Sequence, residues 1–321
     1  MNQMAQIMAA GGGVGINVST LRPRYAHTKS TNGRSSGAVS WSEIYSYTTG
    51  LIEGGGSRRG ALMLILEDWH PDIMEFINVK RDAKRILNAN ISVGISNEFM
   101  KAVEGDLDWQ LVFPDTTYPN YKELWNGNIK EWIASDKPIK VWKTVKAKEL
   151  WNAIIESAWA CAEPGLWFKG RANEYSNSWY YAPLIAVNPC AEQPLDEWSV
   201  CLLGSINLSK FVIPYGEVGH HTINWKDLER AVRTAVRFLD DVIEVTPYVY
   251  PEMEDKQKSE RRIGLGTMGL AEVLIRLKLR YGSPESLKFI DELYQSIAYW
   301  AYDESINLAM EKGAFPRCAT D

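Results

Sequence analysis

Hydrophobic and polar residues along the chain follow patterns that predict strands alternating with helices. The apolar run at 61–67 is typical of a buried strand, and 92–96 and 109–113 are further predicted strands. Apolar residues three or four positions apart predict amphipathic helices over 145–161 and 226–245. Strands that alternate with helices indicate an α/β fold with parallel strands.

The last predicted helix has the clearest ends. Ser283 can cap its start, Pro284 fits its first turn, and Gly313 fits just beyond its end. Between the predicted elements, the small polar residues of 27–40 predict a loop. Residues 114–138, rich in Pro, Asn, Asp and Trp, predict a surface excursion.

Composition and charge narrow the class of protein. The chain has 321 residues, of which 45% are hydrophobic and 23% charged, and no segment marks a domain boundary, so we expect a single domain over 1–321. The net charge of −5 argues against a nucleic-acid partner. The sequence shows neither an apolar stretch of about 18 residues nor a secretion signal, which predicts a cytoplasmic protein without a membrane partner.

Cysteine and histidine are too sparse and too scattered to predict a disulfide framework or a metal site. The His220-His221 pair lies in a polar, turn-like segment and is predicted to be surface, and His70 is predicted to be a turn or cap residue. The four cysteines, in a chain of this length, indicate reduced thiols; they are Cys161, Cys190, Cys201 and Cys318.

The segment 188–192, Asn-Pro-Cys-Ala-Glu, is the most informative for chemistry. On an extended segment alternate side chains share a face, so Asn188, Cys190 and Glu192 can converge on one small ligand. A carboxylate beside a thiol disfavours the thiolate, so the arrangement suits a neutral hydrogen donor or a thiyl radical beside a general base. The alternative is that Cys190 and Cys201 are ordinary buried cysteines.

Two clusters of basic residues are candidates for phosphate contacts. In 54–60, glycines allow close approach of the backbone to a ligand, and Arg58 and Arg59 can pair with phosphate or stack on a base. The alternative is a flexible surface loop with solvated arginines. The second cluster consists of Arg22, Arg24, Lys29 and Arg34.

Residues Gly264, Gly266 and Gly269 match the spacing of a dinucleotide-binding fingerprint, but that interpretation is rejected. The fingerprint requires an apolar strand before it, whereas 252–262 is mostly charged. A tight turn that opens a helix near 267–278 explains the glycines instead.

Several segments, taken in their order and spacing, carry a resemblance to a known family. They are GGGVGINVSTLRPR at 11–24, SSGAVSW at 35–41, GGGSRRGALMLILEDWHPDIMEFI at 54–77, NANISVGIS at 88–96, NPCAEQPL at 188–195, CLLGSINLS at 201–209 and RRIGLGTMGL at 261–270. In them the chain resembles the large catalytic subunit of ribonucleotide reductase. The DWHPDI pattern is most similar to the adenosylcobalamin-dependent class II enzymes. The class I subunit, which takes its radical from a partner subunit, is the alternative.

The resemblance implies a fold and an active site. The family's catalytic domain is a ten-stranded α/β barrel of two five-stranded parallel halves, with a finger loop inside that carries the active cysteine. Cys190 would then be the thiyl radical, shielded from water, that takes the 3′ hydrogen of a ribonucleotide. Glu192 would be the base at the 3′ hydroxyl. Asn188, with Gly13 and Pro189, would contact the substrate, and Cys201 would deliver reducing equivalents from an external dithiol such as thioredoxin.

The resemblance also implies an allosteric site for a deoxynucleotide effector, on loops at 27–37 and 54–61. The residues expected there are Arg22, Lys29, Ser57, Arg58 and Arg59. Such loops usually lie near the interface of a homodimer.

Some features of the family are not found in this sequence. The cysteine partner of Cys201, the Pro-Thr-Gly phosphate loop and the C-terminal redox tail are absent, so we expect a central fragment of the barrel that needs complementing reductase segments for turnover. A non-catalytic deoxynucleotide-binding fragment and an inactive remnant are the alternatives.

Overall fold

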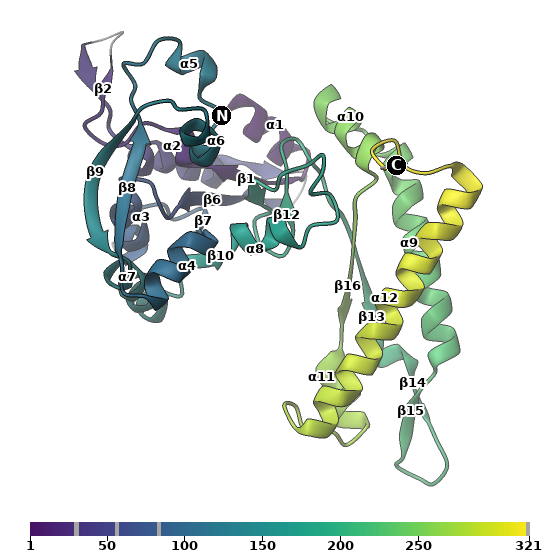
Figure 1. The fold of residues 1–321 in the computed structure, drawn as a ribbon. Coiled ribbons are helices and arrows are strands. Elements are labelled where there is room, and N and C mark those ends of the chain that lie inside the picture. The colour runs from purple at the N-terminus through teal and green to yellow at the C-terminus, as the bar shows by residue number, and fades with distance from the viewer. Residues whose placement is uncertain (29–31, 55–57, 82–84, 319–321) are drawn as a thin grey trace. The chain divides into compact units, whose positions relative to one another are not determined.

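The computed structural model describes residues 1–28, 32–54, 58–81 and 85–318, and it divides into two compact units (Figure 1). Unit 1 spans Met1–Glu197 and unit 2 spans Trp198–Asp321. Both are mixed α/β structures that contain parallel strands. The expectation of a single domain stays a prediction.

Unit 1 is organised around a parallel four-stranded sheet in the order β1-β6-β7-β10. Its strands are β1 (Gly13–Asn17), β6 (Ala61–Glu67), β7 (Asn90–Gly94) and β10 (Gly165–Trp167). The predicted strand at 61–67 is confirmed. The strand predicted at 92–96 begins and ends two residues earlier, because Ser96 caps the following helix with a side-chain oxygen that accepts from the Phe99 amide at 3.1 Å.

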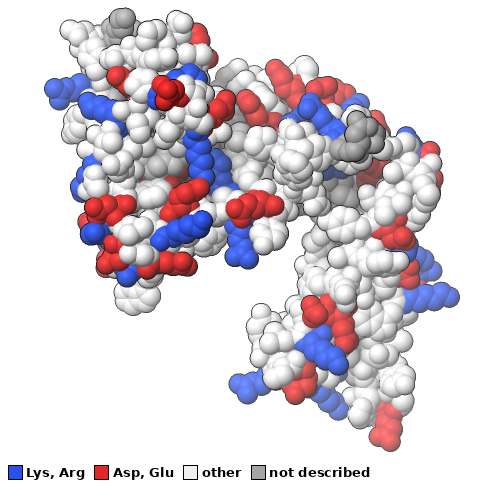
Figure 2. All heavy atoms as spheres, in the orientation of Figure 1, with Lys and Arg blue, Asp and Glu red and all other residues white. Residues whose placement is uncertain are grey.

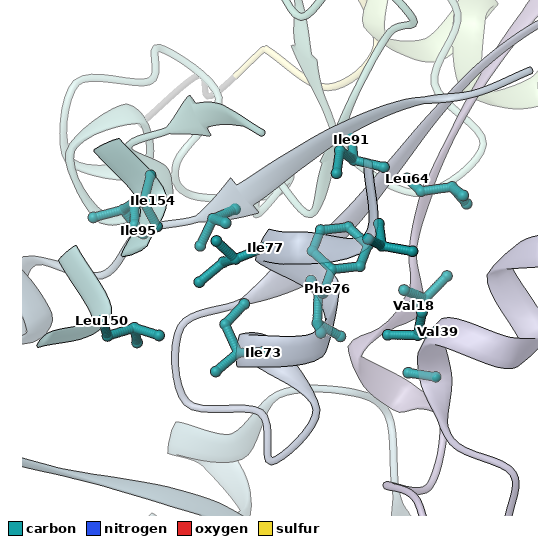
Figure 3. Packing of buried hydrophobic residues seen from close by; sticks show 14 of the residues in the cluster. Val18, Val39, Leu64, Ile73, Phe76, Ile77, Ile91, Ile95, Leu150 and Ile154 are labelled. Atoms are coloured by element: carbon teal, nitrogen blue, oxygen red, sulfur yellow. The ribbon is translucent and has the colours of Figure 1, made fainter. Parts of the chain in front are cut away.

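One face of this sheet is apolar and packed against helices; we call it the helix-covered face. Its residues include Leu62, Leu64 and Leu66 of β6 and Ile91 and Val93 of β7, all at most 2% exposed. They join one large core with residues of α2, α3, α4 and α7 (Figure 3). The helices are α2 (Ala38–Leu51), α3 (Ile73–Asn78), α4 (Asn97–Glu104) and α7 (Ala147–Cys161). The predicted helix over 145–161 is thus confirmed.

The opposite face carries the alternate residues of each strand. On this face β1 contributes small and polar residues, whereas β6 contributes Met63 and Ile65, which are 3% and 0% exposed. The β1 residues are Gly13, Gly15 and Asn17, which pair with Ala61, Met63 and Ile65 of β6. A hairpin made of β11 (Ala186–Val187) and β12 (Pro194–Leu195) packs on this face. Together with Trp167 and Leu184, this hairpin encloses a second, smaller core. We call it the hairpin-covered face.

The predicted strand at 109–113 exists, but its pairing is antiparallel. It is β8 (Asp108–Pro114) and pairs with β9 (Ile139–Lys146). The segment between them was predicted to be a surface excursion, and most of its residues are exposed, but it also contains helices and a small aromatic core that were not predicted. It forms α5 (Tyr121–Leu124) and α6 (Ile129–Ala134), and its aromatic rings pack edge to face around buried Trp132. Trp and Tyr bury large areas, so a short polar-rich segment can still close a core.

The loop predicted over 27–40 is correct only in part. Strands β2 (His27–Thr28) and β3 (Gly33–Arg34) form a short hairpin, and α2 begins at Ala38. Local polarity does not reveal a two-stranded hairpin, since each strand has only two residues. The other elements of unit 1 are α1 (Asn2–Ala9), η1 (Val18–Thr20), β4 (Glu53–Gly54), β5 (Arg58–Arg59), η2 (Val79–Arg81) and α8 (Lys169–Glu174).

Unit 2 is organised around a parallel strand pair and two long helices. Strand β13 (Leu202–Asn207) pairs with β16 (Ile263–Met268), and α9 (Trp225–Val245) packs on both β13 and α12 (Pro284–Lys312). The helices predicted at 226–245 and from Pro284 are confirmed, as are Ser283 and Gly313 at the ends of α12. The other elements are η3 (Leu208–Phe211), β14 (Val212–Pro214), β15 (His221–Ile223), α10 (Pro251–Glu260) and α11 (Leu270–Arg276).

Ion pairs join α9 to α12 along their solvent side. Arg233 pairs with Asp303 at 2.7 Å, and Arg237 pairs with Glu311 at 2.7 Å. Figure 2 shows basic and acidic side chains interspersed over the face in view. Within the part of the chain that the structure describes, no helix is both long and apolar enough to span a bilayer.

The glycines at 264–269 do not form the tight turn that was predicted. Gly264 and Gly266 lie within strand β16, and only Gly269, with a φ of 81°, opens helix α11. The charged segment before them is helix α10 and not a strand, as the rejection of the dinucleotide fingerprint requires.

Candidate active site

The conspicuous Asn-Pro-Cys-Ala-Glu segment forms the tip of the β11–β12 hairpin; we call residues 185–195 the Cys190 hairpin. The backbone amide of Asn188 donates to the backbone carbonyl oxygen of Gln193 at 3.2 Å, and the backbone amide of Gln193 donates to the side-chain oxygen Asn188 Oδ1 at 3.0 Å. The Ala191 amide donates to the Asn188 carbonyl oxygen at 3.0 Å, with Ala191 in the left-handed region at a φ of 68°. Asn188 therefore closes the turn with both its backbone and its side chain.

This turn corrects two expectations. The segment is not extended, so the alternation that was expected to align Asn188, Cys190 and Glu192 does not apply. The side chain of Cys190 is exposed, whereas Asn188 is half-buried. The expected shielding of Cys190 from water is therefore absent among the described residues, because the tip of a two-stranded hairpin has no strand on either side to cover it.

Residues 185–189, the first arm of the Cys190 hairpin, run antiparallel to β1, and every second residue of this arm faces every second residue of β1. Asn17 contacts Ile185, a Cβ added to Gly15 would lie 1.8 Å from the Val187 carbonyl oxygen, and one added to Gly13 would lie 2.6 Å from the Pro189 ring. Any side chain at position 15 would collide with the hairpin backbone. Glycine is required there for close approach of two backbones.

The tip of the hairpin is fixed at the amino ends of the parallel strands. Asn90, the first residue of β7, donates from Nδ2 to the Pro189 carbonyl oxygen at 2.8 Å. Gly13, the first residue of β1, faces the Pro189 ring. The structure therefore brings two expected substrate residues, Gly13 and Pro189, together beside Cys190. Their contact with a substrate stays a prediction.

The base of the hairpin rests on a polar cluster at the carboxyl ends of the strands. Asn17 Nδ2 donates to Glu67 Oε1 at 2.9 Å and to the Ile185 carbonyl oxygen at 3.0 Å. Lys169 forms an ion pair with Glu67, and Trp69 Nε1 donates to Glu67 Oε2 at 3.0 Å. Sequence reasoning missed this cluster. The signal was present: Gly13, Gly15 and Asn17 alternate on one face, and Glu67 ends a buried apolar strand.

Cys201 lies in unit 2, directly before β13. Its side chain is half-buried, and a Cβ added to Gly264 on the neighbouring strand would lie 2.7 Å from its sulfur atom. Gly264 therefore leaves space for the thiol. Its role as a reducing cysteine stays a prediction.

The expected effector residues are described only in part. Lys29 and Ser57, and the side chain of Arg58, lie outside the described residues. Arg59 is exposed. Arg22 is half-buried, with its guanidinium 5.4 Å from the centre of the Tyr121 ring. Burial raises the pKa of the Tyr121 hydroxyl, and the Arg22 charge partly opposes that shift.

Three polar residues of the DWHPD segment, Asp68, His70 and Asp72, are buried, and their hydrogen bonds support the fold. His70 Nδ1 accepts from the Asp72 amide at 3.1 Å, which confirms the predicted turn role of His70, and burial lowers the pKa of its ring. Asp68 Oδ2 accepts from the Ser96 amide at 2.5 Å. Burial raises the pKa of the Asp68 carboxyl to about 7. No group of His, Cys, Asp and Glu within the described ranges could hold a metal ion.

The comparison with protein families decides what this sheet and hairpin belong to. A family model described as the ribonucleotide reductase barrel domain matches residues 1–320. The chain belongs to this family. This match confirms the family that the sequence motifs indicated. The Cys190 hairpin lies within the matched residues and is therefore part of a reductase barrel domain.

Curated relatives support the same assignment. The chain is 38% identical to the vitamin B12-dependent ribonucleoside-diphosphate reductase of Thermoplasma acidophilum, over 98% of this chain and 38% of the relative. It is 37% identical to the enzyme of that description from Mycobacterium tuberculosis, over 98% of this chain and 42% of the relative. It is 30% identical to the ribonucleoside-diphosphate reductase large chain of Cryptosporidium parvum, over 98% of this chain and 40% of the relative. The chain spans about two fifths of the length of these relatives.

Proposed function

We propose that this chain supplies the radical-forming part of a ribonucleoside-diphosphate reductase, which reduces ribonucleotides to 2′-deoxyribonucleotides. One observation carries the proposal. A turn closed by Asn188 presents the exposed thiol of Cys190, with Glu192 two residues on, at the tip of a hairpin fixed to the sheet. It does so in a chain that aligns with reductases over 98% of its length.

The roles follow from the chemistry of these groups. Cys190, as a thiyl radical, takes the 3′ hydrogen atom of the ribonucleotide, and Glu192 accepts the proton of the 3′ hydroxyl. The 2′ hydroxyl leaves as water. A cysteine pair, made of Cys201 and a cysteine of the complementing reductase segments, supplies the two electrons and two protons as it becomes a disulfide: one proton leaves in the water, and the other hydrogen is placed on the 2′ carbon. Cys190 then returns its hydrogen atom to the 3′ carbon and is a thiyl radical again. Asn188 both closes the turn and hydrogen-bonds the ribose, and an external dithiol, such as thioredoxin, reduces the disulfide.

The names of the two B12-dependent relatives favour adenosylcobalamin as the radical source. When bound, adenosylcobalamin supplies a carbon-centred radical that can take a hydrogen atom from a nearby thiol. The exposed position of Cys190 at a hairpin tip fits that requirement, since its sulfur is open to a neighbouring group. The residues of this chain hold the thiol in place and keep Glu192 within the same turn.

The proposal includes the rest of the family's architecture. The chain supplies the central part of a ten-stranded barrel of two five-stranded parallel halves, and complementing reductase segments cover Cys190 and exclude water from it. The effector site for a deoxynucleotide lies at Arg22, Lys29, Ser57, Arg58 and Arg59. The homodimer and the cytoplasmic location stay predictions.

A chimeric enzyme tests this function. Residues 1–320 replace the matched segment of the Thermoplasma acidophilum reductase, and deoxynucleotide formation is measured with a ribonucleoside diphosphate, adenosylcobalamin and a dithiol. We expect turnover by the chimera, none by the isolated chain, and none by the Cys190→Ala chimera. The control is Cys161→Ala, which we expect to stay active, since Cys161 lies on α7 and donates to the Ser157 carbonyl oxygen.

The outcomes separate the alternatives. Turnover by Cys190→Ala close to that of the unmodified chimera would remove Cys190 from the radical role. Turnover that requires a radical-generating partner subunit instead of cobalamin would assign the class I mechanism. A folded chimera that binds deoxynucleotides in calorimetry without turnover would show a binding fragment. Turnover by the isolated chain would refute the need for complementing segments.

A further inference from the structure

We propose that Asn17 is a positioning residue that fixes the register of the Cys190 hairpin on β1, and that the Glu67–Lys169 ion pair holds Asn17 in place. The inference rests on the proposed function only in giving Cys190 the reactive role. The positioning itself is a property of the described residues of unit 1.

Every polar atom of the Asn17 side chain has a partner. An asparagine amide has two N–H donors and one carbonyl acceptor. Oδ1 accepts from the Ser19 amide at 3.0 Å, while Nδ2 donates to Glu67 Oε1 at 2.9 Å and to the Ile185 carbonyl oxygen at 3.0 Å. The side chain therefore has one orientation, and its second N–H is aimed at the base of the hairpin.

Glu67 is itself fixed from several sides. It is 8% exposed, and its carboxylate receives Lys169 and Trp69 Nε1 in addition to Asn17. Lys169 begins α8, which follows β10. The ends of β1, β6 and β10 thus meet the hairpin at one cluster. A buried carboxylate that keeps its cation and its donors does not move, so it forms a rigid support.

Register matters because the hairpin follows β1 in two-residue steps. Ile185, Val187 and Pro189 face Asn17, Gly15 and Gly13 in turn. A slip of one residue would move Cys190 by about 3.3 Å and turn the hairpin's side chains to the opposite face. Gly13 and Gly15 allow the backbones of β1 and the hairpin to approach each other, but they do not determine the register. The directed contacts within the hairpin are Asn17 at the base and Asn90 at the tip, while Asn173 of α8 bonds both backbone groups of Leu184, directly before the hairpin.

The double variant N17D/E67Q removes the donor to Ile185 and keeps positions 17 and 67 joined. The carboxylate introduced at position 17 still accepts from the Ser19 amide and accepts from the amide introduced at position 67. Lys169, which shares Glu67 Oε1 with Asn17, exchanges its carboxylate partner from position 67 to position 17, and the Ile185 carbonyl oxygen loses its donor. Hydrogen exchange of residues 184–195, followed by mass spectrometry, measures the effect. We expect exchange about tenfold faster than in the unmodified chain, as for the loss of one buried hydrogen bond.

Two further readouts separate positioning from general stability. The melting temperature of N17D/E67Q is expected to stay within about 4 °C of the unmodified chain. The rate at which iodoacetamide alkylates Cys190 is expected to change, whereas the rate at Cys161 is expected to stay constant. The single variant E67Q tests the second half of the proposal: it breaks the Glu67–Lys169 ion pair while Asn17 keeps an acceptor at position 67, so hairpin exchange is expected to rise less than in N17D/E67Q.

Unchanged exchange of 184–195 in a folded N17D/E67Q chain would overturn the proposal. If that variant does not fold, N17S serves instead, because serine is too short to reach Ile185, and slow exchange there would equally overturn it. In the chimera, N17D/E67Q is expected to lower kcat with little change in KM. Exchange requires no turnover, so the positioning is decided even if the reductase assignment fails, and Cys190→Ala tests that assignment separately.

Discussion

The two faces of the sheet in unit 1 are covered in different ways. The helix-covered face consists of large aliphatic side chains, including Leu64 at 0% exposure, that interlock with helices (Figure 3). The hairpin-covered face presents Gly13, Gly15 and Asn17, over which a hairpin backbone lies directly on the strand. The first face is closed by apolar volume. The second combines a smaller apolar core around Met63 and Ile65 with close backbone approach and directed hydrogen bonds.

This difference separates stability from placement. Burying large apolar side chains supplies most of the free energy of folding but tolerates several packings. Hydrogen bonds and steric limits supply less energy and specify one position. The candidate reactive thiol, Cys190, is carried by the second kind of contact. The following predictions test this division, beginning with the largest expected effect.

Phe76→Ala should destabilise unit 1 strongly. Phe76 of α3 is 0% exposed within the core of the helix-covered face, and truncation of such a residue costs about 3–5 kcal/mol. Urea unfolding followed by circular dichroism measures the change. Leu87→Ala is the control, because Leu87 is 63% exposed and should change stability by less than about 0.5 kcal/mol. A loss below about 1 kcal/mol for Phe76→Ala would contradict the account of this core.

Gly15→Ala should displace the hairpin at a smaller cost in stability. The added Cβ would lie 1.8 Å from the Val187 carbonyl oxygen, so the hairpin has to move, at about 1–3 kcal/mol. Hydrogen exchange of 184–195 should become faster. Gly266→Ala is the matched strand control, since its Cβ would meet Ser205 Oγ at an ordinary 3.4 Å. If both variants behave alike, the close approach at Gly15 does not hold the hairpin.

Asp68→Asn should change how stability depends on pH. Asp68 follows Glu67 in sequence, and burial raises the pKa of its carboxyl to about 7 from the ordinary 3.8. The folded state therefore holds a proton that the unfolded state releases, and the contribution of Asp68 to the free energy of unfolding falls as pH rises from 3.8 to about 7.

Asp68→Asn has no carboxyl to titrate, so its free energy of unfolding lacks this decrease. The stability of the variant relative to the unmodified chain should therefore increase with pH across this window. Unfolding by urea at several pH values measures the difference. His70, whose buried ring has a lowered pKa, gives the opposite slope in both proteins and largely cancels from the comparison. A difference that is independent of pH would show that Asp68 is ionised throughout.

The sequence predicted best those features that depend on neighbours along the chain. The strand at 61–67, the helices at 145–161 and 226–245, and the ends of α12 at Ser283 and Gly313 were all correct. Helix caps and apolar spacing act within a few residues, so the sequence shows them directly.

Features that depend on distant contacts were missed. The aromatic core of 114–138 and the antiparallel pairing of β8 with β9 were not predicted, because polar composition does not show what covers an aromatic ring. The segment at 188–192 was interpreted as extended, whereas the bonds between Asn188 and Gln193 form a turn. The alternation of side chains that was expected to place Cys190 and Glu192 on one face therefore does not apply.

The sequence by itself determined the local elements, the family and the kinds of chemical group available. The tertiary structure alone decided which groups meet. Asn17 and Ile185 are 168 positions apart, and their contact exists only because β1 and the Cys190 hairpin fold onto the same face of one sheet. Local propensities act over single turns of chain, whereas the position of Cys190 is set by hydrogen bonds and steric limits between segments that are far apart in the sequence.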